Sequence, residues 1–92
     1  MKVTEVNVRK MFDEGILKAI VSVTFDDCFV VHDIKVVDTG EKKMVVMPSV
    51  KTADGRFRDT VHPMTSEFRK HIVEEVHAAV AAAKAARAVE DT

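Results

Sequence analysis

The chain has 92 residues, of which 47% are hydrophobic and 32% charged, and its formal net charge at pH 7 is −1. This length and balance are typical of one compact globular domain, predicted to span residues 1–92, and they argue against a disordered or multidomain protein. A domain this short buries a modest share of its surface, so self-association is a reasonable source of further burial.

The N-terminal residues Met1–Glu5 are partly polar where a signal peptide needs an apolar stretch, and no run approaches the length of a membrane span. We therefore expect a cytoplasmic protein. The one cysteine, Cys28, excludes an intramolecular disulfide, and with four scattered histidines it gives no zinc-site spacing. We expect neither a metal nor a cofactor, and we interpret Cys28 as a buried, inert residue near a strand start.

Two strands are predicted first. Residues 3–12 are rich in β-branched residues, which favour a strand over a helix. A turn at residues 13–15 follows, and residues 17–25 then alternate between apolar and polar side chains. Two such runs around a short loop containing Gly15 predict a β-hairpin.

Residues 29–37 predict a third strand, with Val30, Ile34 and Val36 on one face. His32 is placed on that apolar face and interpreted as a hydrogen-bonded core or sheet residue, because no second metal ligand stands at a useful spacing. Residues 44–47 predict a short fourth strand that ends at Pro48, which cannot donate a ladder hydrogen bond.

Between Pro48 and Phe57 the sequence predicts a polar loop centred on Asp54-Gly55, a pair that favours the positive φ angles of tight turns. If the segment Arg56-Phe57-Arg58 is extended, its period of two sends both guanidinium groups to one face and anchors Phe57 on the other.

A helix is predicted at about residues 65–89. Thr65 or Ser66 can cap its first backbone N–H groups. Apolar residues recur at spacings of three and four to form one stripe, which becomes almost entirely alanine past Val80. The predicted fold is therefore α+β: an antiparallel sheet of four to five strands within about residues 2–62, followed by a long C-terminal helix.

Charge is distributed unevenly along the chain. Residues 42–70 contain seven basic and three acidic residues, a balance of +4, whereas the remaining residues contain seven basic and twelve acidic, a balance of −5. Clustered positive charge is suited to binding a polyanion. The candidate phosphate-binding residues are Lys51, Arg56 and Arg58 around the loop and Arg69 and Lys70 in the first helical turns.

No enzyme is expected, because the sequence contains neither a recognised nucleophile arrangement nor a glycine-rich phosphate loop. A base-stacking surface is also not expected. The chain has no tryptophan or tyrosine, and Phe25, Phe29 and Phe68 are interpreted as core residues. The basic residues could equally form an ordinary solvated surface, paired with Asp54, Asp59 and Glu67.

Four sequence blocks favour nucleic-acid binding over an ordinary solvated surface: residues 30–34 (VVHDI), 46–49 (VMPS), 54–59 (DGRFRD) and His62-Pro63. In order and spacing they resemble the stage V sporulation protein G family, also called the septation regulator family, over residues 1–72. The resemblance implies a small bacterial cytoplasmic protein with an antiparallel sheet and a C-terminal helix. It also implies a homodimer that binds DNA, and in some cases RNA, to regulate gene expression.

In that family a Lys-Arg pair after Met-Pro-Ser and the arginine of the Phe-Arg-Asp block are implicated in nucleic-acid binding. The resemblance places the second residue of the pair on Lys51 and the later arginine on Arg58. The first residue of the pair falls on Val50, a departure, and Arg56 replaces a usually acidic residue.

Two hypotheses follow. In the first, a homodimer presents two copies of the loop from Lys51 to Arg58 to nucleic acid, without a membrane or a small-molecule substrate. In the second, a sheet edge or the alanine-rich helix binds a protein partner in cell division, without direct nucleic-acid binding.

Overall fold

The computed structural model describes the backbone of residues 1–90 and the side chains of residues 1–86. Asp91 and Thr92, which the predicted domain includes, lie outside the described residues. Four antiparallel strands form one sheet in the order β1-β2-β3-β4: β1 (Val3–Met11), β2 (Leu17–Phe25), β3 (Phe29–Asp38) and β4 (Lys43–Val46). Two short strands, β5 (Ser49–Lys51) and β6 (Phe57–Asp59), form a separate hairpin, and the helix α1 (Ser66–Glu90) ends the described chain.

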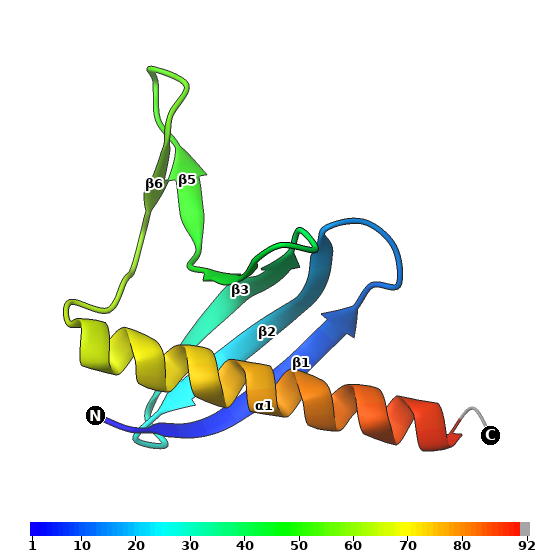
Figure 1. The fold of residues 1–92 in the computed structure, drawn as a ribbon. Coiled ribbons are helices and arrows are strands. Elements are labelled where there is room, and N and C mark those ends of the chain that lie inside the picture. Colours follow the sequence, from blue (N-terminus) through cyan, green and yellow to red (C-terminus); the bar gives the residue numbers. More distant parts are fainter. Residues whose placement is uncertain (91–92) are drawn as a thin grey trace.

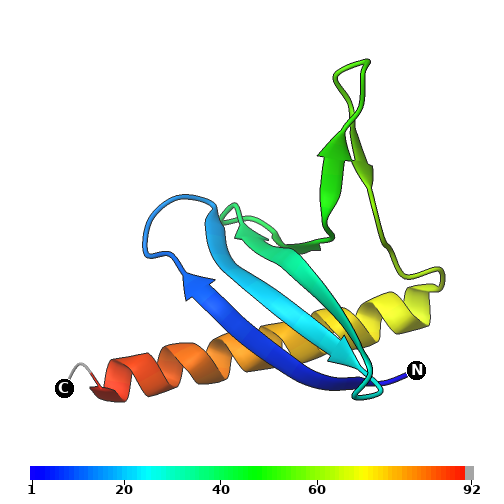
Figure 2. The ribbon, with the colours of Figure 1, turned by 180° about the vertical axis from the view of Figure 1, so that it is seen from behind.

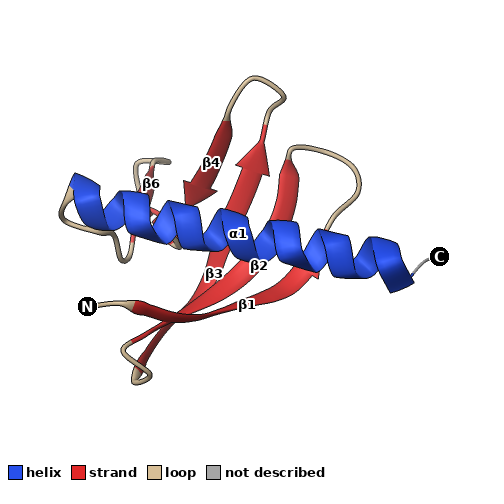
Figure 3. Ribbon diagram, turned by 60° about the horizontal axis from the view of Figure 1, so that its bottom comes forward, coloured by secondary structure: helices blue, strands red, loops and turns tan. Residues whose placement is uncertain are grey.

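The helix lies across one face of the four-stranded sheet, and within residues 1–90 no helix covers the opposite face (Figures 1, 2 and 3). Strand β2 supplies the centre of the core through Ala19, Val21, Val23 and Phe25, whose alternate spacing directs them to one face. The helix contributes buried residues one turn apart: Ile72, Val76 and Val80. The predicted α+β fold is confirmed.

The helix begins with the predicted kind of cap. The Oγ1 atom of Thr65 accepts a hydrogen bond from the backbone N–H of Phe68 at 3.1 Å, so Thr65 is the cap and Ser66 is the first helical residue. The backbone N–H of Val3 donates to Nε2 of His71 at 3.3 Å, which joins the start of β1 to the helix. Within the described part of the chain, no helix is both long and apolar enough to cross a membrane.

A β-bulge in β3 corrects the predicted faces of that strand. Val21 pairs with Ile34 and Val23 with Val31, so His32 and Asp33 together lie opposite Ser22. Asp33 has a φ of 62°, and the extra residue reverses the alternation that follows. Val31, and not Val30, therefore shares the core face with Ile34.

His32 consequently lies on the face away from the helix, where it is exposed, and not on the apolar face that the sequence indicated. Its predicted hydrogen bonding is confirmed, because Nδ1 lies 2.8 Å from Oγ of Ser22. Ser22 is only 4% exposed, so this bond provides a partner for a buried hydroxyl group.

The prediction that Cys28 is buried was wrong. Cys28 is exposed at the end of the β2–β3 turn, where its N–H donates to the carbonyl of Phe25 at 3.0 Å. Asp26 and Asp27 in this turn both have positive φ angles, 52° and 55°, as the central residues of a type I′ turn do. A short turn that projects from the sheet leaves no neighbouring surface to cover the thiol.

Candidate nucleic-acid interface

The hairpin β5–β6, called the arm below, stands away from the rest of the molecule (Figure 1). Its strands pair Ser49 with Asp59, Val50 with Arg58 and Lys51 with Phe57. All six of these residues are exposed. The sequence pattern predicted a loop at Ser49–Lys51, but a three-residue strand is too short to show a hydrophobic period.

The root of the arm is fixed to the core. Met47 is 6% exposed and belongs to the core, and the next residue, Pro48, starts the arm. The backbone N–H and the Oγ1 of Thr60 both donate to the carbonyl of Pro48, at 2.8 and 3.1 Å. These bonds close the base of the hairpin where it leaves the sheet.

The tip of the arm is closed by a second set of hydrogen bonds. The N–H of Thr52 donates to the carbonyl of Arg56 at 2.7 Å, and the N–H of Gly55 donates to the carbonyl of Thr52 at 3.0 Å. Gly55 has a φ of 84°, which confirms the predicted turn at Asp54-Gly55 and favours a residue without Cβ.

The carboxylate of Asp54 is held within this turn. It accepts a hydrogen bond from the hydroxyl of Thr52 and another from the backbone N–H of Arg56 at 3.3 Å, and these two bonds lower the pKa of Asp54. Its Oδ2 also lies 3.8 Å from Nε of Arg56, in an exposed ion pair. Asp54 is therefore ionised at neutral pH and partly offsets the charge of Arg56.

Lys51 and Arg58, the two positions that the family resemblance indicates, lie on the same arm but on opposite faces. Directly paired residues of neighbouring strands share a face, so Lys51 lies with Phe57 and Arg58 lies with Val50. Among the described side chains, no carboxylate lies within ion-pair distance of Lys51 or Arg58. Arg56 precedes β6, in the turn, so it is not part of the strand that the sequence suggested.

Arg69 and Lys70 are exposed in the first turns of α1, and Lys70 pairs with Glu74 at 3.9 Å. The helix packs against β1, β2 and β4, but within the described residues it does not contact β5 or β6. The structure therefore brings Lys51, Arg56 and Arg58 together on the arm and leaves the two helical cations on the body.

Two phenylalanines differ from their predicted environment. Phe29 was expected in the core and Phe57 was expected to be anchored, but they are 54% and 74% exposed. Phe25 is buried, and Phe68 packs against the core as predicted. An apolar residue type does not reveal whether the fold provides a surface opposite it.

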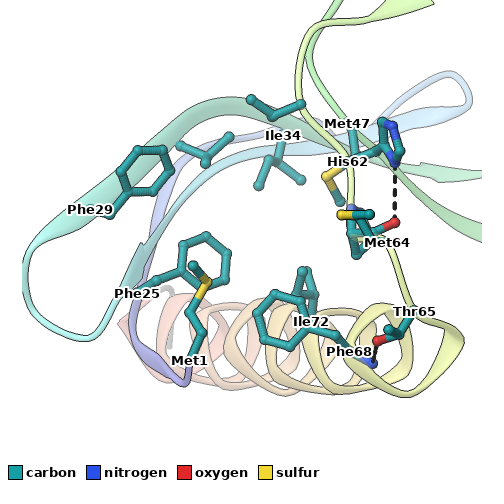
Figure 4. Close-up of a pocket in the computed structure, with 13 residues that line it drawn as sticks. Met1, Phe25, Phe29, Ile34, Met47, His62, Met64, Thr65, Phe68 and Ile72 are labelled. Atoms are coloured by element: carbon teal, nitrogen blue, oxygen red, sulfur yellow. Dashed lines mark hydrogen bonds between the residues drawn. The ribbon is translucent and has the colours of Figure 1, made fainter.

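An apolar cavity of about 420 Å³ lies between the first half of β3, the linker before the helix and the first turns of α1 (Figure 4). Its walls include Phe25, Phe29, Met47, Met64 and Phe68. β4 pairs only with Lys35–Asp38, so the outer edge of β3 before Lys35 has no strand partner in the described structure. This edge and the cavity lie side by side and together form an apolar recess.

Comparison with known proteins was consistent with the sequence blocks. A family model described as SpoVG matches residues 1–81. A protein of Caldicellulosiruptor saccharolyticus is 48% identical over 86 residues, covering 89% of this chain and 98% of the relative. A protein of Caldanaerobacter subterraneus subsp. tengcongensis is 53% identical over 79 residues, covering 82% and 87%.

A third relative, from Clostridioides difficile, is 49% identical over 76 residues, which are 83% of each chain. All three bear the name "Putative septation protein SpoVG". The family model matches most of the chain, and the three alignments cover most of the length of each relative. The chain therefore belongs to the SpoVG family.

Proposed function

We propose that this chain is a non-enzymatic, nucleic-acid-binding regulator that acts as a cytoplasmic homodimer in the control of gene expression, sporulation or septation. The family membership and the relatives' names support the link to septation and sporulation. One observation carries the binding proposal: the arm projects from the body with Lys51, Arg56 and Arg58 exposed to solvent.

The charge of a single arm is small, which is why the proposal includes a dimer. Residues 49–59 contain three cations and two carboxylates, a balance of +1. Phosphate contacts contribute to affinity in proportion to their number, so two arms in one assembly double what one arm supplies.

The experiment is direct. Fluorescence anisotropy with labelled random-sequence DNA and RNA, single- and double-stranded, should show binding that weakens as salt rises, and sedimentation should give a dimer. If none of the four probes binds at low salt, the nucleic-acid function is wrong.

A second candidate is a protein-interaction module without direct nucleic-acid binding. The observation that favours it is the unpaired edge of β3 before Lys35, beside the apolar cavity. A partner strand added there would gain backbone hydrogen bonds and could place apolar side chains in the cavity. Under this hypothesis, substituting Phe29 abolishes partner binding, whereas substituting Arg58 has no effect.

A further inference from the structure

Phe57 is the most exposed of the five phenylalanines, at 74%, and it lies on the arm, where no part of the described body covers it. The other phenylalanines lie against the sheet or the helix, or, in the case of Phe12, under the amino group of Lys10 at 5.1 Å from the ring centroid. A large aromatic side chain held in water loses the free energy of burial that it could otherwise supply. Its position on the arm leaves the ring available to a ligand.

Most of the charged residues near Phe57 are cationic. Lys51 lies directly across from it on the same face of the arm, and Arg56 and Arg58 line the hollow at the tip together with Phe57. Asp59 is the acidic residue on the face of Phe57, two residues further along β6. Lysine is depleted in the dry centres of protein–protein interfaces, so a face shared by Phe57 and Lys51 is poorly suited to burial against another protein. Aromatic rings beside cations are instead the usual composition of surfaces that bind single-stranded nucleic acid.

An open hollow of about 530 Å³ lies at the tip of the arm, and Asp54, Arg56, Phe57 and Arg58 contribute to its walls. The lowered pKa of Asp54 keeps a negative charge in this hollow, and that charge repels a phosphate group. A nucleobase carries no such charge, and its N–H groups can donate hydrogen bonds to a carboxylate. The hollow thus favours the base of a nucleotide, while the surrounding cations favour its phosphates.

We propose that Phe57 stacks on an unpaired nucleobase, so that the arm binds single-stranded DNA or RNA in preference to a fully paired duplex. This inference rests on the proposed nucleic-acid function and names the form of nucleic acid that the arm takes. It revises the sequence-based expectation that a base-stacking surface is absent, which rested on the lack of tryptophan and tyrosine and on the assignment of Phe25, Phe29 and Phe68 to the core. Bases within a duplex are already stacked on each other, so the ring of Phe57 gains its contact only with an unpaired base.

The absence of tryptophan and tyrosine from the chain makes the test specific. Phe57→Trp introduces one fluorophore at the site, and its emission should be quenched by single-stranded oligonucleotides of DNA and RNA. Phe57→Ala should weaken single-strand binding by about 5- to 150-fold, as for other stacking residues. Phe57→Leu retains apolar bulk on the arm without an aromatic ring, and it should lose a similar factor.

The salt dependence separates stacking from charge. Because neither Phe57→Ala nor Phe57→Leu removes a cation, the slope of log K against log salt should match the wild-type slope, and duplex binding should be unchanged. Ile16→Ala is the matched control, since Ile16 is 60% exposed in the β1–β2 loop and lies outside the arm. This variant should bind as the wild type does.

The outcomes are distinguishable. If the wild type binds nucleic acid while the Ala and Leu variants retain full single-strand affinity, stacking is wrong and the proposed function stands. Unchanged emission from a Phe57→Trp protein that binds single strands leads to the same conclusion. If Phe57→Ala converts a dimer into monomers in sedimentation, Phe57 belongs to a protein interface and the inference is overturned. A wild type that binds no nucleic acid overturns both proposals.

Discussion

Removing the free cations of the arm should change the salt dependence of binding by an amount that the structure predicts. Lys51 and Arg58 have no carboxylate partner among the described side chains, so each is available for one phosphate contact per protomer. Each contact contributes about 0.9 to the slope of log K against log salt on duplex DNA and about 0.7 on a single strand. In a dimer, Arg58→Ala should therefore reduce the slope by about 1.8 or 1.4.

The same arithmetic gives the loss of affinity. At 0.1 M salt one phosphate contact on a duplex raises the binding constant by about eightfold relative to 1 M salt. Arg58→Ala removes one cation from each protomer of the dimer, so it should weaken binding by about 60-fold. Lys51→Ala should have a similar effect, and the double variant should combine the two effects. Arg56→Ala should have a smaller effect, because the ion pair with Asp54 already offsets its charge.

Fluorescence anisotropy between about 0.05 and 0.3 M salt measures both the affinity and the slope of log K against log salt, over a range in which phosphate contacts are strongly salt-dependent. Lys84→Ala is the matched control, since Lys84 is exposed on the helix and lies outside the arm. Arg58→Lys keeps the charge and should keep the slope. The reasoning is refuted if Lys84→Ala and Arg58→Ala change the slope equally, or if neither changes it.

Three further predictions concern stability and the tip of the arm. Val76→Ala removes a side chain that is 0% exposed and should lower the free energy of unfolding by about 2–3 kcal/mol in urea denaturation; a decrease below about 0.5 kcal/mol would contradict the core described here. Thr65→Ala should cost about 1 kcal/mol by removing the cap on the N–H of Phe68, and Thr65→Ser should restore most of it, whereas equal stabilities would show that the cap contributes nothing. The pKa of Asp54 is below its ordinary value of 3.8, so the hydrogen bonds at the tip are fully favoured above that pH and are lost as the pH falls through the lowered value; the carboxyl carbon shift in NMR reports this titration, and Thr52→Ala should raise the pKa.

The sheet and helix were predictable because the sequence patterns that indicate them extend over many residues. The alternation in Leu17–Phe25 and the three- and four-residue spacing from Phe68 to Val80 place the apolar core residues on one face of each element, which the structure confirms. The face of Val30 was not predictable. It depends on Asp33 taking a φ of 62° opposite Ser22, and a bulge leaves no periodic trace in one sequence.

The candidate site was predictable in composition but not in arrangement. The turn at Asp54-Gly55 and the identity of the cations were visible in the sequence. The separation of Lys51 from Arg58 onto opposite faces follows from the pairing register, which a three-residue strand does not specify. The exposure of Phe57 could not be found either, because it depends on the absence of a covering surface in the described fold.

The closures at Thr60–Pro48 and Thr52–Arg56 have a mechanical consequence for the arm. A hairpin pinned at both of its ends keeps its shape when it is displaced, so any displacement must occur in the short segments that join it to the core. The position of the tip is then determined by the length of the segments that join the hairpin to the core. The side chains that the tip presents are determined by the hairpin itself. Lengthening the segment between Val61 and Met64 by one residue would relocate the tip and leave the side chains it presents unaltered.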